Sequence, residues 1–505
     1  MSCGMGGPGD TAPPLKSMHK KLDSLKKVIA LELPLAGILL EVLLYGVLWF
    51  TSYYPLVRLR LKFYFKGHLL VLIIYFVLLL FFMKTYGGTN AGYQKPLDVI
   101  LSQLFSLVMV NIITYFQDSL LRNWTLPVGP IVLCTLLQLV LSVLWVNFSD
   151  LVYKKAFPPA DLILIHGERP VRDILDKFAS RPDRYHITDC IDIAEGLPAI
   201  KAKILQEHKA VVLWDIPTVY RNELVKFCYA GGIRMYMMPK IPDVLIKGSA
   251  QLHLFDTPLY MTREYALSFG QRFFKRLIDI VCAVILLVLT SPVFLITAIL
   301  IRCYDHGPVF YRQVRCTIHQ KEFRIIKFRS MRVDAEKDGV ARLAAEHDDR
   351  ITPIGRFIRK VRIDELPQLI NILHGEMSFI GPRPERPEII AQYLEDMPEF
   401  VFRMKVKAGL AGYAQVYGKY NTTPYDKLKL DLTYIQNYSV WLDLKLMLLT
   451  LKILLKPEST EGVSTGQITA LRTDVEEGEA GHGVCGPDDA QTPAGNEGAR
   501  DADRK

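Results

Sequence analysis

The chain has 505 residues, of which half are hydrophobic, and a formal net charge of +9. This length exceeds what one hydrophobic core can organise, so two or three domains are expected. The basic residues are not gathered with interleaved aromatic residues, which excludes a nucleic-acid partner. The eight cysteines form no CxxC pair and no zinc-like spacing with histidine, so we expect free thiols in a reducing cytosol.

Residues 1–27 are predicted to form a flexible basic tail without a cleavable signal. Four apolar runs follow within residues 28–148, and each approaches the roughly 20 residues that cross a bilayer. These runs predict a bundle of four transmembrane helices at residues 28–50, 69–83, 97–116 and 128–148. Glu32 and Glu41 interrupt the first run. Such a group is either functional or directed into the bundle, and the second alternative is favoured for Glu32.

The basic residues near the ends of the spans predict their orientation. If the N-terminus is cytoplasmic, nine lysines lie on that side and five basic residues on the other, which favours this arrangement. The nine are Lys16, Lys20, Lys21, Lys26, Lys27, Lys84, Lys95, Lys154 and Lys155; the five are Arg58, Arg60, Lys62, Lys66 and Arg122. Four spans then return the chain to the cytosol after residue 148.

Residues 158–262 are predicted to form a cytoplasmic, degenerate Rossmann-like α/β domain. Apolar strands at 162–165, 186–191, 210–214 and 234–238 alternate with helices at 171–179, 197–208 and 219–230. A dinucleotide site would need GxGxxG after the first strand, where this chain has HGER. Tyr236 and Lys240 form a Tyr-x-x-x-Lys pair, but Pro239 breaks the helix that would align them. A regulatory or structural domain is therefore expected.

A further apolar segment at residues 275–301 begins with Lys275, Arg276 and Asp279 and is interrupted by Ser291 and Pro292. Pro292 cannot donate to the helix ladder, and Ser291 can cap the broken end. A complete crossing would separate the α/β domain from the phosphate-type motifs that follow. We therefore favour a re-entrant helix that returns to the same side, with a proline-kinked span as the alternative.

An acidic pair, Asp364 and Glu365, follows Arg359 and Arg362 on a predicted helix whose first half ends at Pro367. Carboxylates beside arginines suit phosphate chemistry on a metal-bound nucleotide, because carboxylates bind a hard cation or attack phosphorus and guanidinium groups bind phosphate oxygens. Solvated helix charges are the alternative. Basic strands at 307–315 and 323–331 and the rigid segment Gly-Pro-Arg-Pro at 381–384 favour a site.

Taken together, the segment from Lys275 to Asp279, Ser291-Pro292, KFRSM, DELPQ and GPRP resemble the bacterial sugar transferase family, the monotopic phosphoglycosyl transferases. The resemblance covers about residues 272–457, and it implies an α/β monotopic catalytic domain at residues 272–456 with a re-entrant membrane helix. The four spans and the α/β domain are similar to those of long-form members, which begin exopolysaccharide, capsule or O-antigen biosynthesis. The fold class is then a multidomain protein of the bacterial inner membrane, with its catalytic domain facing the cytoplasm.

The resemblance implies transfer of sugar-1-phosphate from a UDP-sugar to undecaprenyl phosphate, with release of UMP and with Mg²⁺ as cofactor. Asp364 matches the nucleophile that forms a covalent phosphosugar intermediate, and Glu365 matches its partner in metal binding or proton transfer. Either carboxylate is a candidate metal ligand. Membrane lipids are further expected partners, and a homodimer is left open.

Several basic residues are candidates for binding the phosphates. Arg383 is the leading one because two prolines fix its backbone. Lys327 and Arg329 come next, followed by Arg359 and Arg362. Related enzymes often have Ser or Thr where this chain has Arg362, and a surface role is slightly favoured for this arginine. A later motif is expected on the substrate side at Lys405, Lys407, Gly409, Gln415 and Gly418, whereas a structural role is favoured for Asp431.

The last apolar segment, residues 434–455, is predicted to be an amphipathic interfacial helix with Trp441, Lys445 and Lys452 at headgroup level. A sixth span is the alternative, against which Asp443 and Lys445 argue. Residues 457–505 are predicted to be a disordered acidic tail.

Two other functions remain open at this point. A membrane-tethered nucleotide-sugar dehydratase or oxidoreductase would fit the spans and the α/β domain, although the glycine-rich loop is missing. A non-catalytic assembly protein that senses a nucleotide is the third alternative, and the acidic pair among basic motifs disfavours it.

Overall fold

The computed structural model describes residues 15–58, 64–167, 169–207, 210–254, 256–262, 266–332, 350–418 and 422–454. They form two compact units, which are treated separately: residues 154–239, and the remainder of the described chain. Residues 1–14, the predicted tail at 457–505, and Arg60 and Lys62 of the orientation argument lie outside the described residues.

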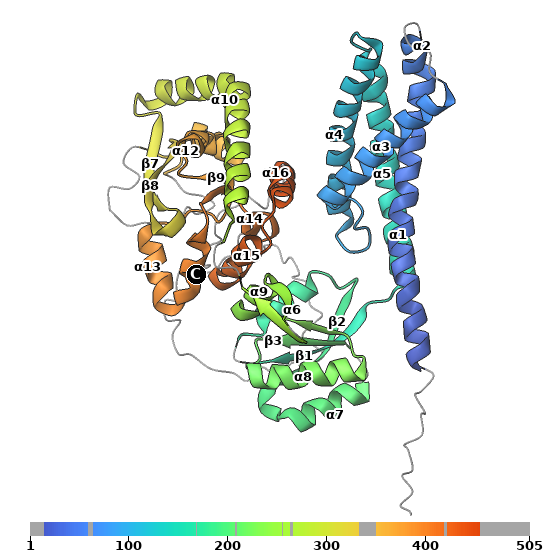
Figure 1. Cartoon of the computed structure of the whole chain (residues 1–505), viewed down its shortest axis with the longest axis vertical. Helices are drawn as coiled ribbons and strands as arrows, with labels where there is room; N and C mark the ends of the chain where they lie inside the picture. Colours follow the sequence, from blue (N-terminus) through green and yellow to red (C-terminus); the bar gives the residue numbers. More distant parts are fainter. Residues whose placement is uncertain are drawn as a thin grey trace, which may run out of the picture. The chain divides into compact units, whose positions relative to one another are not determined.

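Four long helices form the predicted bundle and lie side by side in Figure 1. They are α1 (Leu15–Leu48), α3 (Phe65–Tyr86), α4 (Pro96–Arg122) and α5 (Val128–Ala156), and α1 continues through η1 (Trp49–Tyr53) and α2 (Tyr54–Val57). Each contains a segment long and apolar enough to cross a membrane, which confirms the four predicted runs. Residues 15–27 are helical, so the flexible tail predicted there is wrong: leucine and lysine favour helix, and α1 runs through them.

One face of α1 and η1 carries buried aromatic residues, and the opposite face of α1 carries exposed aliphatic residues. Tyr45, Trp49 and Tyr53 recur every four residues along one face of α1 and η1, and all three are buried. The ring of Tyr45 stacks on Tyr75 of α3 with centroids 4.0 Å apart. The opposite face of α1 exposes apolar side chains at the same spacing, as a lipid-facing surface would: Leu35, Leu39, Leu43 and Val47.

The smaller unit is a parallel α/β sheet. Its strands β1 (Ala160–His166), β2 (Tyr185–Asp192), β3 (Ala210–Trp214) and β4 (Met235–Met237) lie in the order β2-β1-β3-β4. The helices are α6 (Arg172–Ala179), α7 (Leu197–Glu207) and α8 (Thr218–Gly231), with the turn η2 (Ile193–Glu195). These elements agree with the predicted alternation. Figure 1 shows α7 and α8 on one face of the sheet.

The two faces of β1 pack on different helices because successive side chains of a strand point in opposite directions. Ile163 and Ile165 share a core with Ile200 of α7 and Leu224 of α8. Leu162 and Leu164 share another with residues of α6. Both faces of the strand are therefore covered, as expected of a parallel sheet.

The C-terminal region, residues 240–454, begins with α9 (Ile241–Lys247) and a hairpin of β5 (Ala250–Leu254) and β6 (Thr257–Met261). Ile241 and Val244 of α9 join the core that contains Leu428 and Leu432 of α15 (Pro424–Gln436). The α/β unit thus ends at Pro239, earlier than the predicted boundary at residue 262. The physical reason is that α9 buries its apolar face on α15.

Two small sheets organise the rest of this region. Strand β7 (Phe310–Cys316) pairs antiparallel with β8 (Glu322–Phe328) across η3 (Ile318–Gln320), and β9 (Ser378–Ile380) pairs parallel with β10 (Gly409–Ala411). The surrounding elements are α11 (Pro353–Lys360), η4 (Ile363–Glu365), α12 (Gln368–His374), α13 (Pro387–Asp396), η5 (Pro398–Lys405) and α14 (Tyr413–Tyr417). One hydrophobic core links β7, β8, β9, α12 and α15.

Helix α10 (Phe269–Asp305) is long, apolar and sharply bent (Figure 1). Pro292 lies inside it and lacks the amide hydrogen that would bond the Val288 carbonyl. The Ser291 hydroxyl donates to this carbonyl at 2.8 Å and so satisfies the group that the proline leaves without a donor. The helix therefore continues through Pro292 as one bent element, and Ser291 acts inside the bend instead of capping a broken end.

Both arms of α10 pack against the C-terminal region. In the first arm, the carboxylate of Asp279 accepts hydrogen bonds from the Ser378 hydroxyl at 3.0 Å and the Phe379 amide at 2.9 Å, both in β9. In the second arm, the Phe294 ring lies 4.7 Å from the ring of Phe328 in β8. The remaining surface is strongly apolar, because large apolar side chains such as Leu289, Leu295 and Ile299 are exposed along the helix.

The predicted interfacial segment is divided into two helices. α15 ends at Gln436, and α16 (Val440–Leu454) begins after Ser439, whose hydroxyl accepts a hydrogen bond from the Leu442 amide as an N-cap does. Leu446 lies in the core of the C-terminal region and Leu449 in the core of the membrane bundle. Lys452 is buried and donates to the Ser102 hydroxyl of α4 at 2.5 Å, so its predicted place among lipid headgroups is wrong.

Candidate active site

The acidic pair lies in η4, a single 3₁₀ turn between α11 and α12. Helix α11 begins at Pro353 with the Thr352 hydroxyl accepting from the Gly355 amide at 2.9 Å. It ends at Lys360 because Arg362 adopts a left-handed conformation with φ 55°. The predicted helix is thus interrupted before Asp364 and Glu365, and the left-handed residue turns the pair out of the helical path.

The Glu365 carboxylate is held by two cations from separate segments. Its Oε1 lies 3.4 Å from Lys327 Nζ at the end of β8 and 3.7 Å from Arg383 Nη2 in the loop after β9. Burial by itself would raise the pKa of Glu365, but the positive charges of Lys327, Arg383 and Arg362 outweigh it and lower the pKa to about 2. Glu365 is therefore a fixed anion at neutral pH.

Asp364 has the opposite character. Burial and the adjacent negative charge of Glu365 raise the pKa of Asp364 to about 6, against the opposing charges of Lys327, Arg359 and Arg383. Within the described residues no group donates a hydrogen bond to its carboxylate or forms an ion pair with it. Two neighbouring carboxyls with separated pKa values are typical of a site in which each performs a different task.

The loop that carries Arg383 is fixed through its backbone. Gly381 donates to the Ala411 carbonyl at 2.9 Å, and the Pro382 carbonyl accepts from the Gly409 amide at 2.9 Å. A side chain on Gly381 would collide with the Lys407 carbonyl, so only glycine fits there. The Arg383 side chain, 47% exposed, is directed from this rigid loop toward Glu365 while remaining open to a ligand.

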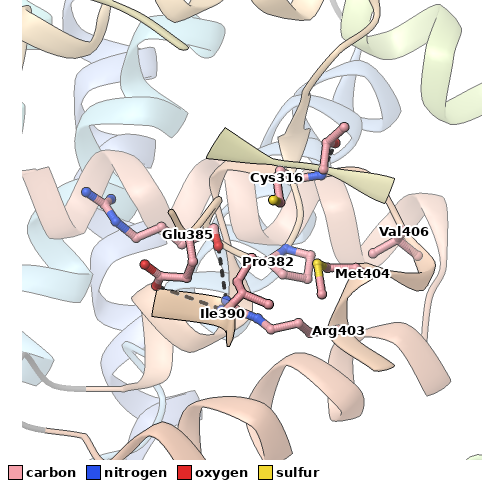
Figure 2. A pocket seen from close by; sticks show the side chains of 10 residues that line it. Cys316, Pro382, Glu385, Ile390, Arg403, Met404 and Val406 are labelled. Atoms are coloured by element: carbon pink, nitrogen blue, oxygen red, sulfur yellow. Dashed lines mark hydrogen bonds and ion pairs between the residues drawn. The ribbon is translucent and has the colours of Figure 1, made fainter. Parts of the chain in front are cut away.

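A buried ion-pair cluster supports the same loop from the other side. Arg403 donates to the Arg383 carbonyl at 3.1 Å, lies 3.8 Å from Glu385 and pairs with Asp431 at 2.8 Å. Figure 2 shows Arg403 joined to Glu385 across a pocket. Asp431 is fully buried, and burial raises its pKa while Arg403 opposes this rise. This position agrees with the structural role favoured for Asp431.

The pocket in Figure 2 lies beside the Arg383 loop. Its lining consists of Cys316, Thr317, Pro382, Arg383, Glu385, Ile390, Arg403, Met404, Val406 and Ala408. Arg315 lies nearby and donates to the Pro384 carbonyl at 3.2 Å. Burial lowers the pKa of Arg315 to about 10, and Glu385 opposes this shift. The arginines at 315 and 403 were not singled out by sequence, since only the fold brings them to this loop.

The other predicted phosphate ligands are less central. Arg329 is 8% exposed, and its guanidinium lies against Gly307 at the turn after α10. Arg359 and Arg362 act electrostatically, on Asp364 and Glu365 respectively. Lys327 is half-buried, and burial lowers its pKa while Glu365 opposes the shift. The structure thus places Lys327 and Arg383 directly at the acidic pair.

The residues of the motif predicted on the substrate side, from Lys405 to Gly418, lie in different parts of the C-terminal region. Lys405 lies over the Phe402 ring at 5.3 Å, and Lys407 lies near Arg276, where burial and that like charge lower its pKa. Gly409 pairs with Ser378 in the small parallel sheet. Gln415 is on α14 and Gly418 directly follows it. None of these side chains has an ion pair with the acidic pair among the described residues.

The two basic residues predicted at the start of the re-entrant helix form hydrogen bonds with other elements of the C-terminal region. Lys275 is buried and donates to Asp443 at 2.6 Å, the Ile380 carbonyl at 2.8 Å and the Tyr434 hydroxyl at 3.1 Å. Arg276 donates to the carbonyls of Ile372 and Leu373 at the end of α12. These bonds connect α10 to both elements that flank the acidic pair and the Arg383 loop.

Comparison with known proteins shows that the C-terminal region is similar to bacterial sugar transferases. A family model described as bacterial sugar transferase matches residues 270–457. The chain is 43% identical over 186 residues to a UDP-N-acetylgalactosamine-undecaprenyl-phosphate N-acetylgalactosaminephosphotransferase of Aeromonas hydrophila, covering 36% of this chain and 44% of the relative. It is 39% identical over 210 residues to a UDP-glucose:undecaprenyl-phosphate glucose-1-phosphate transferase of Escherichia coli (strain K12), covering 41% and 43%.

A shorter relative is matched over almost its whole length. The chain is 39% identical over 198 residues to an uncharacterized sugar transferase of Bacillus subtilis (strain 168), covering 39% of this chain and 94% of the relative. By contrast, the matched segment spans less than half the length of the two relatives above. The similarity therefore concerns the C-terminal region, which contains the acidic pair.

Proposed function

The chain belongs to the bacterial sugar transferase family, and from this membership we propose that it transfers sugar-1-phosphate from a UDP-sugar to undecaprenyl phosphate with release of UMP. Two relatives are named for this reaction with different sugars. The observation that carries the proposal is the acidic pair: Asp364 has no hydrogen bond or ion pair within the described residues, while Glu365 is held by Lys327 and Arg383.

In the first step an oxygen of the Asp364 carboxylate attacks the β-phosphorus of the UDP-sugar. A bond from aspartate oxygen to phosphorus forms, the bond from the β-phosphorus to the bridging oxygen breaks, and UMP leaves with the electron pair. Arg383 and Lys327 lie within ion-pair distance of Glu365, one residue from the nucleophile, so they can bind the diphosphate oxygens. Arg359 adds positive charge close to Asp364.

In the second step a phosphate oxygen of undecaprenyl phosphate attacks the same phosphorus. The aspartyl-phosphate bond breaks, Asp364 is restored as a carboxylate, and the sugar remains on the lipid as a diphosphate. Splitting the transfer into two displacements allows one set of cations to bind both phosphates in turn. Glu365 keeps Lys327 and Arg383 in place between the two steps.

The residues present fit a Mg²⁺ site. The described residues contain no group of three or more His, Cys, Asp or Glu that could hold a metal. Mg²⁺ nevertheless needs only one or two protein carboxylates when substrate diphosphate and water complete its shell. Asp364 and Glu365 are therefore its proposed ligands, and a bound Mg²⁺ would neutralise charge on the phosphates.

We expect UMP release from one or a few UDP-sugars by the detergent-solubilised protein, and only when both Mg²⁺ and undecaprenyl phosphate are present. The assay uses a panel of UDP-sugars and measures UMP directly. A single preferred sugar would also identify the substrate. Dependence on NAD(P) instead of the lipid would contradict the proposal, because the oxidoreductase alternative would then hold.

The pH dependence of this activity follows from Asp364. A nucleophilic carboxylate must be ionised, and the pKa of Asp364 is raised to about 6, so kcat/KM for the UDP-sugar should be constant above this pH and fall as the pH decreases below it. Bound Mg²⁺ favours the ionised form, so raising its concentration should move the midpoint lower. A flat profile down to about pH 4, near the pKa of an ordinary aspartate, would contradict this assignment.

We further propose that α10 is a re-entrant membrane helix and that the α/β unit is Rossmann-like, in a protein of the bacterial inner membrane whose catalytic region faces the cytoplasm. Support comes from the two arms of α10, because Asp279 in one and Phe294 in the other both contact the C-terminal region. A straight helix of 37 residues would be about 55 Å long and could cross a bilayer completely.

This topology is tested with two cysteine positions in otherwise cysteine-free variants. Cys303, exposed near the end of α10, should react with a membrane-impermeant maleimide from the same face as a cysteine introduced by Ser180→Cys on the α/β unit. Inverted membrane vesicles should label both, and intact spheroplasts neither. Labelling of the two positions from opposite faces would establish a complete crossing by α10.

A further inference from the structure

The transmembrane bundle buries many polar side chains. Those with exposure of at most 8% are Glu41, Thr85, Ser102, Gln103, Ser106, Asn111, Thr114, Asp118, Gln138, Ser142 and Ser149. Within the hydrocarbon of a bilayer, a polar group without a hydrogen-bond partner is costly, and an ionisable group is a candidate functional site. The two carboxylates in this set belong to no part of the reaction described above.

Glu41 lies well inside the span of α1 and is 3% exposed. Its Oε1 accepts a hydrogen bond from the Ser142 hydroxyl of α5 at 2.9 Å. Its Oε2 is buried and has no hydrogen-bond partner among the residues that the structure describes. The side chain therefore faces the bundle interior, where one oxygen is satisfied by a neutral donor and the other is not satisfied.

Asp118 on α4 shows the same half-satisfied arrangement. It is fully buried and its Oδ2 accepts from the Tyr45 hydroxyl at 3.0 Å, whereas its Oδ1 has no partner within the described part of the chain. Thr114, one helical turn earlier on α4, is also buried, and its hydroxyl has no partner in the described helices. Two buried oxygens one turn apart on α4 therefore lack hydrogen-bond partners among the described residues.

A group of buried polar side chains between α3, α4 and α5 satisfies its own hydrogen bonds. The Tyr75 hydroxyl donates to Asn111 at 2.8 Å, Asn111 donates to Gln138 at 2.8 Å, and Gln138 donates back to the Tyr75 hydroxyl at 2.8 Å. Gln138 also donates to the Glu41 backbone carbonyl at 3.0 Å. Among the described residues of the bundle, the buried side-chain oxygens without a partner also include those of Tyr86, Gln94 and Ser149, but only Glu41 and Asp118 in this set are carboxyls.

The charge balance around the two carboxylates is also incomplete. Within the described helices neither Glu41 nor Asp118 forms an ion pair with a lysine, arginine or histidine. The titratable side chains that interact electrostatically with Glu41 are Tyr75 and Cys134. Those that interact with Asp118 are Tyr45 and Tyr53. All four are neutral in their common forms, so nothing there compensates a negative charge.

We propose that Glu41 and Asp118 are two intramembrane proton-binding sites, each carrying one proton as a neutral carboxylic acid in the folded bundle. Each site consists of a carboxyl whose first oxygen accepts from a hydroxyl, of Ser142 or Tyr45, and whose second oxygen binds the proton. The proton removes the uncompensated charge from hydrocarbon, which an ionised carboxylate without a cationic partner would leave there. The only ligand of each site is a proton, and no covalent bond of the protein is broken when it binds.

The test is infrared spectroscopy of the full-length protein in lipid bilayers at neutral pH. The native protein should show carbonyl bands of protonated carboxyls that shift in deuterium oxide. Glu41→Gln should remove one such band and Asp118→Asn another, with the helical amide bands unchanged. Glu32→Gln is the matched control, and this variant should lose no protonated band. Glu32 lies on the same helix but is exposed, so the interior position favoured for it from the sequence is wrong.

A second measurement needs no variant. Dicyclohexylcarbodiimide, a membrane-soluble reagent, adds to protonated carboxyls, and peptide mass analysis of the native protein should find the adduct at Glu41 or Asp118 and not at Glu32. The proposal is overturned if the variants remove carboxylate bands instead. It is also overturned if those bands move between sodium and potassium buffers, which would identify metal-cation sites. If a variant does not fold, the adduct pattern decides.

Discussion

Asp364→Asn is expected to reduce UMP release by at least about 1,000-fold, because an amide cannot form the bond to phosphorus that the first displacement requires. The substitution keeps the size of the side chain and removes no hydrogen bond or ion pair, since Asp364 has none within the described residues. The measurement is UMP release with the preferred UDP-sugar. Mass analysis should also detect a phosphosugar on the peptide that contains Asp364 in the native enzyme only.

The matched control is Asp396→Asn, the same chemical change at an exposed carboxyl at the end of α13, which should leave turnover unchanged. Glu365→Gln should behave differently from both. It removes the anion that holds Lys327 and Arg383, so activity should fall while a phosphosugar adduct can still form on Asp364. Normal turnover by Asp364→Asn would remove this residue from the role of nucleophile.

Lys275→Met is expected to lower the free energy of unfolding of the C-terminal region by about 3–5 kcal/mol, because it leaves Asp443 buried without its cation. The pair is closely spaced, at 2.6 Å, with side-chain exposures of 7% and 6%, so solvent cannot compensate the lost charge. The midpoint of thermal unfolding should fall by roughly 10 °C. Unfolding is followed by labelling of the buried Cys316 thiol, which reports on this region alone.

Two further variants separate burial from charge. Lys275→Met combined with Asp443→Leu should recover most of the stability, since an apolar pair leaves no unpaired charge. Lys203→Met breaks an exposed pair with Glu195 in the α/β unit, where both side chains are 41% exposed, and should have little effect. Equal stability of the native protein and the Lys275→Met variant would show that this ion pair does not hold the region together.

Loss of the Lys275 side chain should also affect the reaction. Lys275 donates to the Ile380 carbonyl at the end of β9, and the next residues form the loop that carries Arg383. A weakened Lys275 variant that still folds should therefore bind the UDP-sugar less tightly, through a displaced Arg383 and not through direct contact. Thus α10 fixes the geometry of the loop that carries Arg383.

The sequence determined much of this protein because several signals are local. The four spans follow from apolar runs, the α/β unit from strands and helices in alternation, and the acidic pair from its position among basic motifs. The predictions from sequence were wrong where long-range packing overrides a local pattern. Residues 15–27 extend α1, α9 leaves the α/β unit to pack on α15, and Lys452 binds α4 instead of lipid headgroups.

Only the tertiary structure could determine the roles of the individual charges. Asp364 and Glu365 are adjacent and chemically similar in sequence, yet Lys327 and Arg383, from distant segments, make one a fixed anion and leave the other free. Arg403 and Asp431 likewise meet only in the folded chain. Charge interactions depend on distance in space and on exclusion of water, and a linear sequence specifies neither until the backbone has folded.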